Sequence, residues 1–305
     1  MPSPAANHSP LVVLALVSLS TAFPRLSQPR PGVADPVAIP FTVSDGMLVV
    51  PATVGGTTPI HMILDTGAGL DILAPSLIGK LHGRRAGAFS AHRMTGERID
   101  VPLFVIPEIK IGPVVRSGTV VGAWDVLDTL HLDGILSVNS FRESAFTIDF
   151  VTRVLTFETP QSLTGRRAAG RVSPLRVDDL RGTALDLFAT FLIGSEPGQC
   201  EIDTGSQSAV VSMRFLGPLG IEKDGPGVVR RERRTIAGGL EVRYDTTLPR
   251  LALGSTPPFV LADPVVSFSD IIYDCVIGTQ FWSGRVLTID IANRQLIVSG
   301  PSPAP

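Results

Sequence analysis

Apolar and polar residues alternate in short runs along most of this chain, and a two-residue period predicts β-strands. The runs MLVVPATV, at 47–54, and IHMIL, at 60–64, are separated by a Gly-rich turn and predict a hairpin. TALDLFATFLI, at 183–193, and QCEI, at 199–202, flank another Gly-rich turn in the same way. The pattern therefore favours a mostly β protein that contains at least two similar hairpins.

Each predicted hairpin leads into the same triplet, Asp-Thr-Gly. A single turn of this kind is common in loops and carries little information. Two later landmarks also recur, in the same order and at spacings of 138 to 141 residues. The matched pairs are Asp65 with Asp203, Phe141 with Phe281, and FTIDFVTRVLTF from Phe146 with LTIDIANRQLIV from Leu287. This regularity predicts a duplicated structural unit.

A second, projecting hairpin is predicted in each unit, because a Gly-bearing polar stretch separates two β-type runs around 95–97 and around 237–239. Helical periodicity predicts only short helices, at 75–81 and 213–219. We therefore expect two similar lobes. The predicted organisation is a signal peptide at 1–22, a linker at 23–38, an N-terminal lobe at 39–158, a connector at 159–170, a C-terminal lobe at 171–299 and a tail at 300–305.

The N-terminal region is the only part of the chain with a long apolar run. LVVLALVSLSTAF, at 11–23, has the length of a signal-peptide core, and Ser20-Thr21-Ala22 offers a small-x-small cleavage pattern. These features predict export to the periplasm or the extracellular space, and no stable membrane span in the mature chain. No Lys or Arg precedes the run, so an uncleaved anchor and a disordered apolar leader remain alternatives.

Composition narrows the classes of partner and cofactor. Hydrophobic residues make up 44% of the chain and charged residues 18%, as in a globular protein, and the net charge of -2 gives no reason to expect nucleic acid. The histidines show neither an HExxH pattern nor Cys/His ligand spacing, so no metal site is predicted. The stretch from Gly67 starts like a dinucleotide fingerprint, but Ile72 occupies the third Gly position, and we expect no cofactor.

Two Asp-Thr-Gly turns, each followed downstream by an apolar-apolar-small element, resemble the aspartic peptidases. The downstream elements are Ile135-Leu136-Ser137 and Val276-Ile277-Gly278. The likeness covers about 39–298 and is greatest to a single-chain, two-lobed form of the retropepsin-like group. It implies two closed β lobes related by a pseudo-two-fold axis, with the active-site cleft between them. One chain then builds the whole site, so we expect a monomer.

The resemblance implies an endopeptidase in which Asp65 and Asp203 activate a water molecule that attacks a peptide bond of an extended peptide or protein substrate. Two carboxyl groups held close together share one proton, because like charge disfavours the second ionisation. The implied supporting residues are Thr66, Gly67, Ala68, Thr204, Gly205 and Ser206. The Ser206 hydroxyl is expected to donate to Asp203. A catalytically inactive peptide-binding protein on the same scaffold is the alternative function.

The projecting hairpins correspond to flaps in this family. The flap candidates are His92, Met94, Thr95, Gly96, Gly238 and Gly239. No Tyr stands in the first hairpin, so its contacts with a substrate would differ from those of pepsin-like enzymes. The basic run RRERR, at 230–234, is interpreted as a solvated hairpin face. Ser137 departs from the Gly that the family prefers at this position, although its side chain is small.

Several further residues are assigned structural roles. Cys200 and Cys275 each precede a landmark by three residues, and the resemblance brings their strands close together, so a disulfide within the second lobe is one hypothesis and a pair of buried free thiols the other. Five aspartates outside the two triplets are interpreted as turn or surface carboxylates. They are Asp71, Asp133, Asp149, Asp274 and Asp290.

Overall fold

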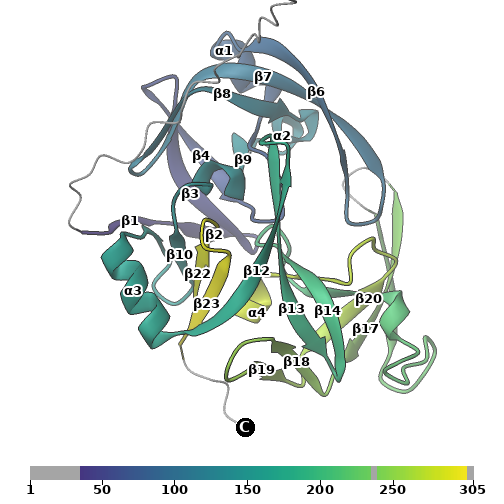
Figure 1. The fold of residues 1–305 in the computed structure, drawn as a ribbon. Coiled ribbons are helices and arrows are strands. Elements are labelled where there is room, and N and C mark those ends of the chain that lie inside the picture. The colour runs from purple at the N-terminus through teal and green to yellow at the C-terminus, as the bar shows by residue number, and fades with distance from the viewer. Residues whose placement is uncertain (1–34, 235–238, 301–305) are drawn as a thin grey trace, which may run out of the picture.

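The computed structural model describes residues 35–234 and 239–300. The predicted signal peptide, most of the predicted linker, the flap candidate Gly238 and the tail beyond residue 300 lie outside the described residues. Figure 1 shows a first lobe built mainly from the purple and blue strands and a second lobe built from the green and yellow ones. Within residues 35–234 and 239–300, no helix is both long and apolar enough to cross a bilayer.

The first lobe is built on an eight-stranded sheet whose strands follow the order β2-β3-β4-β9-β5-β8-β7-β6. These strands are β2 (Thr42–Ser44), β3 (Met47–Val54), β4 (Thr58–Leu64), β5 (Ile72–Leu73), β6 (Arg84–His92), β7 (Arg98–Ile111), β8 (Val114–Ala123) and β9 (Gly134–Leu136). The predicted alternation is present in β3, where Leu48, Val50, Ala52 and Val54 are buried and the intervening side chains are more exposed. This alternation gives the lobe its apolar interior.

The other strands form one fifteen-stranded sheet, which bends through the base of the molecule and the second lobe. These strands are β1 (Val37–Pro40), β10 (Phe146–Asp149), β11 (Val154–Phe157), β12 (Arg171–Leu180), β13 (Ala184–Ile193), β14 (Glu196–Ile202), β15 (Ala209–Ser212), β16 (Val229–Arg234), β17 (Leu240–Thr247), β18 (Arg250–Leu253), β19 (Phe259–Ala262), β20 (Val265–Ser269), β21 (Cys275–Ile277), β22 (Val286–Asp290) and β23 (Gln295–Ser299). Strand β1 begins two residues before the predicted end of the linker.

The helices are short. They are α1 (Pro75–Lys80), α2 (Asp125–Thr129), α3 (Pro160–Ala169), α4 (Thr279–Trp282) and the 3-10 turns η1 (Val138–Phe141) and η2 (Met213–Phe215). Helix α3 occupies the predicted connector and starts in a capping box in which the Thr159 hydroxyl and the Ser162 backbone N–H pair. The helix predicted at 213–219 is only a 3-10 turn over its first three residues, because Gly217 and Gly220 weaken a helix.

The strand pairings repeat between the two lobes. Strand β4 pairs in parallel with β9, which pairs antiparallel with β5; β14 pairs in parallel with β21, which pairs antiparallel with β15. In each lobe the strand after Asp-Thr-Gly also pairs in parallel with a later strand, β5 with β8 and β15 with β20. The predicted repeat of the sequence is therefore a repeat of the topology.

Strands from both halves meet in the base sheet, which runs in the order β1-β11-β10-β22-β23-β12. At its centre β10 pairs with β22, and the buried hydroxyls of Thr147 and Thr288 lie 2.7 Å apart. Large apolar side chains such as Phe141 and Trp282 are fully buried against this sheet. A mostly β fold of two similar lobes, as predicted, is confirmed.

Candidate active site

Asp65 and Asp203 each follow the last residue of a hairpin strand, where the chain makes a tight turn. The backbone N–H groups of Gly67 and Ala68 donate to the Asp65 Oδ1 over 3.0 and 3.1 Å. Those of Gly205 and Ser206 donate to the Asp203 Oδ1 over 2.8 and 3.1 Å. Each turn therefore fixes one oxygen of its carboxyl group with two backbone donors and leaves the other oxygen free of them.

The two turns are joined by the threonines of their triplets. The Thr66 N–H donates to the Thr204 Oγ1 over 3.1 Å, and the Thr204 N–H donates to the Thr66 Oγ1 over 3.0 Å. The Thr66 hydroxyl donates to the Ile202 carbonyl over 2.6 Å, and the Thr204 hydroxyl donates to the Leu64 carbonyl over 2.7 Å. All four bonds cross between lobes and are buried, so they hold the two turns in register.

The carboxyl groups of Asp65 and Asp203 share a hydrogen bond. Burial raises the pKa of Asp65, and burial together with the charge of Asp65 raises the pKa of Asp203 well above its usual range. Both side chains are nevertheless partly exposed, so water can reach them. A proton on the pair belongs to neither residue alone.

Glycine is required beside each carboxyl group because the turns lie so close together. A Cβ on Gly67 would lie 2.6 Å from the Cγ of Asp203, and a Cβ on Gly205 would clash with the carboxyl group of Asp65.

The expected role of Ser206 is wrong in one respect. Its hydroxyl donates to the Ser208 carbonyl over 3.3 Å, so only its backbone N–H supports Asp203. The carboxyls thus have matching donors.

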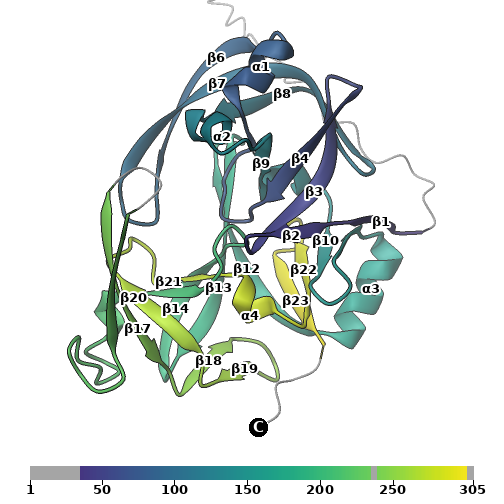
Figure 2. The same cartoon turned by 180° about the vertical axis from the view of Figure 1, so that it is seen from behind.

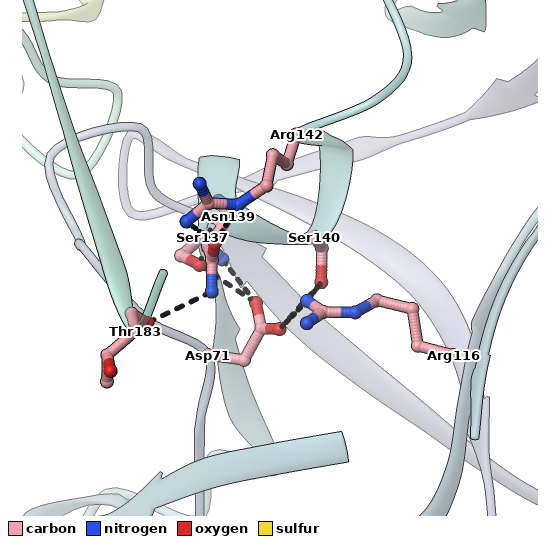
Figure 3. A network of polar contacts seen from close by, with 7 residues as sticks. All are labelled: Asp71, Arg116, Ser137, Asn139, Ser140, Arg142 and Thr183. Atoms are coloured by element: carbon pink, nitrogen blue, oxygen red, sulfur yellow. Dashed lines mark hydrogen bonds and ion pairs between the residues drawn. The ribbon is translucent and has the colours of Figure 1, made fainter. Parts of the chain in front are cut away.

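A polar network supports the first lobe behind its triplet, around a fully buried Asp71 (Figure 3). The Asp71 carboxylate accepts from the backbone N–H and hydroxyl of Ser137 over 2.8 and 3.1 Å, from the Ser140 hydroxyl over 2.6 Å and from Arg116 over 3.3 Å. The interpretation of Asp71 as a turn or surface carboxylate is therefore wrong. Asp290 is also buried, against Arg167 over 2.6 Å.

The same network explains Ser137 at the position where the family prefers Gly. Its hydroxyl donates to Asp71 and accepts from the Asn139 N–H over 3.2 Å, so both of its hydrogen-bonding capacities are used. In the second lobe a Cβ on the matching Gly278 would lie 2.6 Å from backbone atoms of Gln207 and Ser208. Only the first lobe has room for a side chain here.

A cavity of about 580 Å³ opens beside Asp65, between the lobes. Met94 and Thr95 of the first hairpin tip line it, whereas the flap candidates His92, Gly96 and Gly239 are not among its lining residues. Further lining residues come from distant segments and include Arg93, Trp124, Arg233, Arg234 and Glu241. Among these segments only RRERR stands out in the sequence, as a basic run. A larger cavity, of about 720 Å³ beside Gly194 and Leu219, touches neither aspartate.

The first hairpin, β6–β7, reaches across the cleft to the second lobe (Figure 2). The Met94 carbonyl at its tip accepts from the Ile272 N–H over 2.8 Å, and the Met94 side chain packs on Val210, Ile271 and Val276. The RRERR strand, β16, is exposed along its length, and its Arg231 pairs with Asp245. The structure therefore has one hairpin arching over the cleft and a basic one facing it.

Cys200 and Cys275 form a disulfide in the second lobe. They are register partners on the parallel strands β14 and β21, with Cα atoms 4.4 Å apart, directly before Asp203 and Gly278. Of the two hypotheses, the structure therefore has the bonded pair. Among the described residues, no group of three or more His, Cys, Asp or Glu side chains is arranged to hold a metal ion.

Comparison with known proteins agrees with this geometry. The family model for aspartyl proteases matches residues 50–139, which include the first triplet and the first hairpin tip. The crystal structure of basic 7S globulin from soybean superposes with a TM-score of 0.54 at 10% identity, over 88% of this chain and 95% of that one. No curated protein matches. The chain is thus similar to aspartyl proteases over residues 50–139, and its fold is similar to that of the soybean globulin.

The reciprocal threonine bonds give the first prediction. Thr66→Val leaves the Thr204 N–H and the Ile202 carbonyl buried without their partner, so the free energy of unfolding should fall by about 2–4 kcal/mol. Thr66→Ser keeps the hydroxyl and should lose less than half as much. Urea denaturation of both variants measures the difference. Equal losses in the two variants would contradict a dominant role for the hydroxyl.

The Asp71 network gives the second prediction. Asp71→Ala leaves Arg116 and two serine hydroxyls without a buried acceptor, and the free energy of unfolding should fall by about 3–5 kcal/mol. Asp100→Ala is the matched control, because it breaks an exposed pair with Arg98 and should change stability far less than Asp71→Ala does. Denaturant unfolding compares the two. Similar values would contradict a supporting role for the network.

Proposed function

We propose that this chain is an aspartic endopeptidase in which Asp65 and Asp203 activate water for the hydrolysis of peptide bonds. The observation that carries the proposal is the shared hydrogen bond between two carboxyl groups that enter the cleft from equivalent turns. Burial and mutual charge favour one proton on the pair at moderately acidic pH. A pair in this state offers both a base and an acid to one reacting centre.

The proposed reaction uses both forms of the pair. The ionised carboxylate takes a proton from a water molecule, whose oxygen attacks the carbonyl carbon of the peptide bond. The protonated carboxyl donates its proton to the carbonyl oxygen, which gives a tetrahedral intermediate without a covalent enzyme adduct. When the intermediate collapses, the C–N bond breaks and the leaving nitrogen takes a proton from the pair. The four threonine bonds keep the two carboxyl groups at the distance that this exchange needs.

The substrate is proposed to be a peptide or protein segment in extended conformation. The cavity beside Asp65 lies between the two lobes and under the tip of hairpin β6–β7. Strand-like segments present backbone donors and acceptors at regular intervals, which suits a cleft bordered by hairpins. A single chain supplies both aspartates, and we propose that the protein acts as a monomer.

We also propose that the protein is exported. A disulfide between Cys200 and Cys275 is typical of an oxidising compartment such as the periplasm or the extracellular space. The apolar run at 11–23 supports the same location from the sequence. The repeated pairings of the two lobes support an origin by gene duplication.

The third prediction tests the activity. Asp65→Asn and Asp203→Asn should each lower kcat/KM on an unfolded protein substrate by at least about 10²–10⁴-fold, because each removes one half of the acid and base pair. Asp224→Asn, an exposed carboxylate in the second lobe, is the control and should cleave normally. Cleavage is followed by mass spectrometry at several pH values. Wild type that binds peptides but cuts none would identify an inactive peptide-binding protein.

The fourth prediction concerns stability against pH. The folded-state pKa of Asp203 is raised above its unfolded value, so its contribution to stability is present at low pH and is lost as pH rises through the folded pKa. Asp203→Asn removes this dependence and should be more stable than wild type at pH 7, with the difference shrinking as pH falls and absent below about pH 4, where the carboxyl group is protonated in both states. Chemical denaturation at several pH values measures it. A variant that is less stable at pH 7 would contradict the buried like-charge pair.

A further inference from the structure

The repeat allows the two walls of the cleft to be compared position by position. In the first lobe Val49 on β3 is the register partner of Ile63 on β4, which is the partner of Ile135 on β9. In the second lobe the corresponding row is Phe188 on β13, Glu201 on β14 and Val276 on β21. Ile63 and Glu201 each stand two residues before the aspartate of their triplet. The matching positions therefore hold an apolar side chain in one lobe and a carboxyl group in the other.

The first-lobe row faces the cleft, since Val49, Ile63 and Ile135 all line the cavity beside Asp65. Residues two apart on a strand share a face, so Glu201 points to the same side of β14 as Asp203. Met47, two residues before Val49, also lines the cavity. Its counterpart, two residues before Phe188, is Asp186. The second-lobe wall thus carries two carboxyl groups where the first-lobe wall carries a Met and an Ile.

Asp186 lies against the turn of the first triplet. The Leu185 N–H donates to the Gly69 carbonyl over 2.9 Å, and a Cβ on Gly69 would lie 3.2 Å from the Oδ1 of Asp186. Glu201 is only 5% exposed. Asp186 is half-buried. Within the described part of the chain, neither carboxyl group makes a hydrogen bond or an ion pair, and a ligand that supplied one would stabilise both of them.

The pKa values of Glu201 and Asp186 agree with a role of these two carboxyl groups in binding a ligand. Burial and the charges of Asp203, Asp186 and Asp65 raise the pKa of Glu201 well above its usual range, and burial and the charge of Asp178 raise the pKa of Asp186 to about 6. Within residues 35–234 and 239–300, the cation that acts on Asp186 is Arg176, which pairs with Asp178 over 3.2 Å and lies 4.2 Å from the centre of the Phe188 ring. This side of the cleft thus gathers several carboxyl groups around one arginine, and a further positive charge would favour their ionised forms.

We propose that Glu201 and Asp186 receive a positively charged side chain, of the Lys or Arg class, next to the scissile bond on the second-lobe side of the cleft. The proposal rests on the proposed peptidase function and specifies its substrate. Phe188 and Tyr273, whose rings are 5.3 Å apart, supply apolar surface for the methylene groups of such a side chain. The two carboxyl groups supply the charge that its head requires. In the first-lobe half of the cleft, an apolar residue fits.

The test is the cleavage preference of the full chain on an octapeptide library, read by mass spectrometry. Wild type should cut with Lys or Arg enriched at one of the two residues flanking the broken bond. A peptide with Lys there should then have a kcat/KM at least about tenfold above its norleucine analogue. The ratio should rise with pH up to and beyond about 6, as Asp186 ionises.

Two variants and one control decide the assignment. Glu201→Gln and Glu201→Ile, the second of which copies the first lobe, should bring the ratio of kcat/KM for the Lys peptide to that for the norleucine peptide down to about one. A cooperative urea unfolding transition shows that each variant is folded. Glu196→Gln, at the far end of the same strand, should keep the preference. The proposal would be overturned if wild type showed no preference for Lys or Arg, or if it cut a peptide with glutamine at this position faster than one with Lys. A preference that survives Glu201→Gln and Asp186→Asn would also overturn it.

Failure of the peptidase function gives a different result. If wild type cuts no member of the library, the proposed activity is wrong and the acidic wall is tested by binding instead. The same library is passed over the immobilised full chain, and bound peptides are sequenced. Enrichment of Lys or Arg at one position, lost in Glu201→Gln, supports the acidic wall in an inactive peptide-binding protein. Equal retention of basic and neutral peptides overturns it.

Discussion

The reciprocal hydrogen bonds between Thr66 and Thr204 are the constraint on which the rest of the molecule depends. Two buried backbone N–H groups, one in each lobe, have no acceptor within their own lobe and are satisfied only by the other threonine. Separating the turns would break four buried hydrogen bonds at once. The lobes are therefore held together at the place where their carboxyl groups meet. The base sheet repeats this arrangement at larger scale, with β10 against β22.

The constraint makes the cleft symmetric in its backbone and allows it to be asymmetric in its side chains. Both carboxyl groups receive two backbone donors, and both lie beside a glycine of the opposite turn. Behind the turns the lobes differ. Asp71 and Ser137 form a polar network in the first lobe, whereas the corresponding positions in the second lobe are Ala209 and Gly278. The walls of the cleft differ as well, because Ile63 in the first lobe corresponds to Glu201 in the second. A repeat of topology thus preserves the chemistry while each half changes what it contacts.

Much of this could be predicted from the sequence because the features are local or repeated. Strand alternation, the Gly-rich turns and the two triplets lie within a few residues, and their recurrence predicts the two lobes. The burial of Asp71 could not be predicted, because its partner Arg116 lies 45 residues away on another strand. The Ser206 hydroxyl was misassigned because a competing carbonyl is nearby. The difference at Glu201 is visible in the sequence, because the repeat aligns this residue with an isoleucine.

The contact of Met94 with Ile272 limits how a chain can reach the cleft. Hairpin β6–β7 begins and ends in the first lobe and is fastened to the second at its tip, so together they form a ring around whatever lies beneath it. Such a ring admits a free chain end by threading. A longer segment can enter only after the tip of hairpin β6–β7 detaches from the second lobe. For the proposed peptidase function, this arrangement favours unstructured tails and interdomain linkers over the loops of compact domains, which are tethered at both ends.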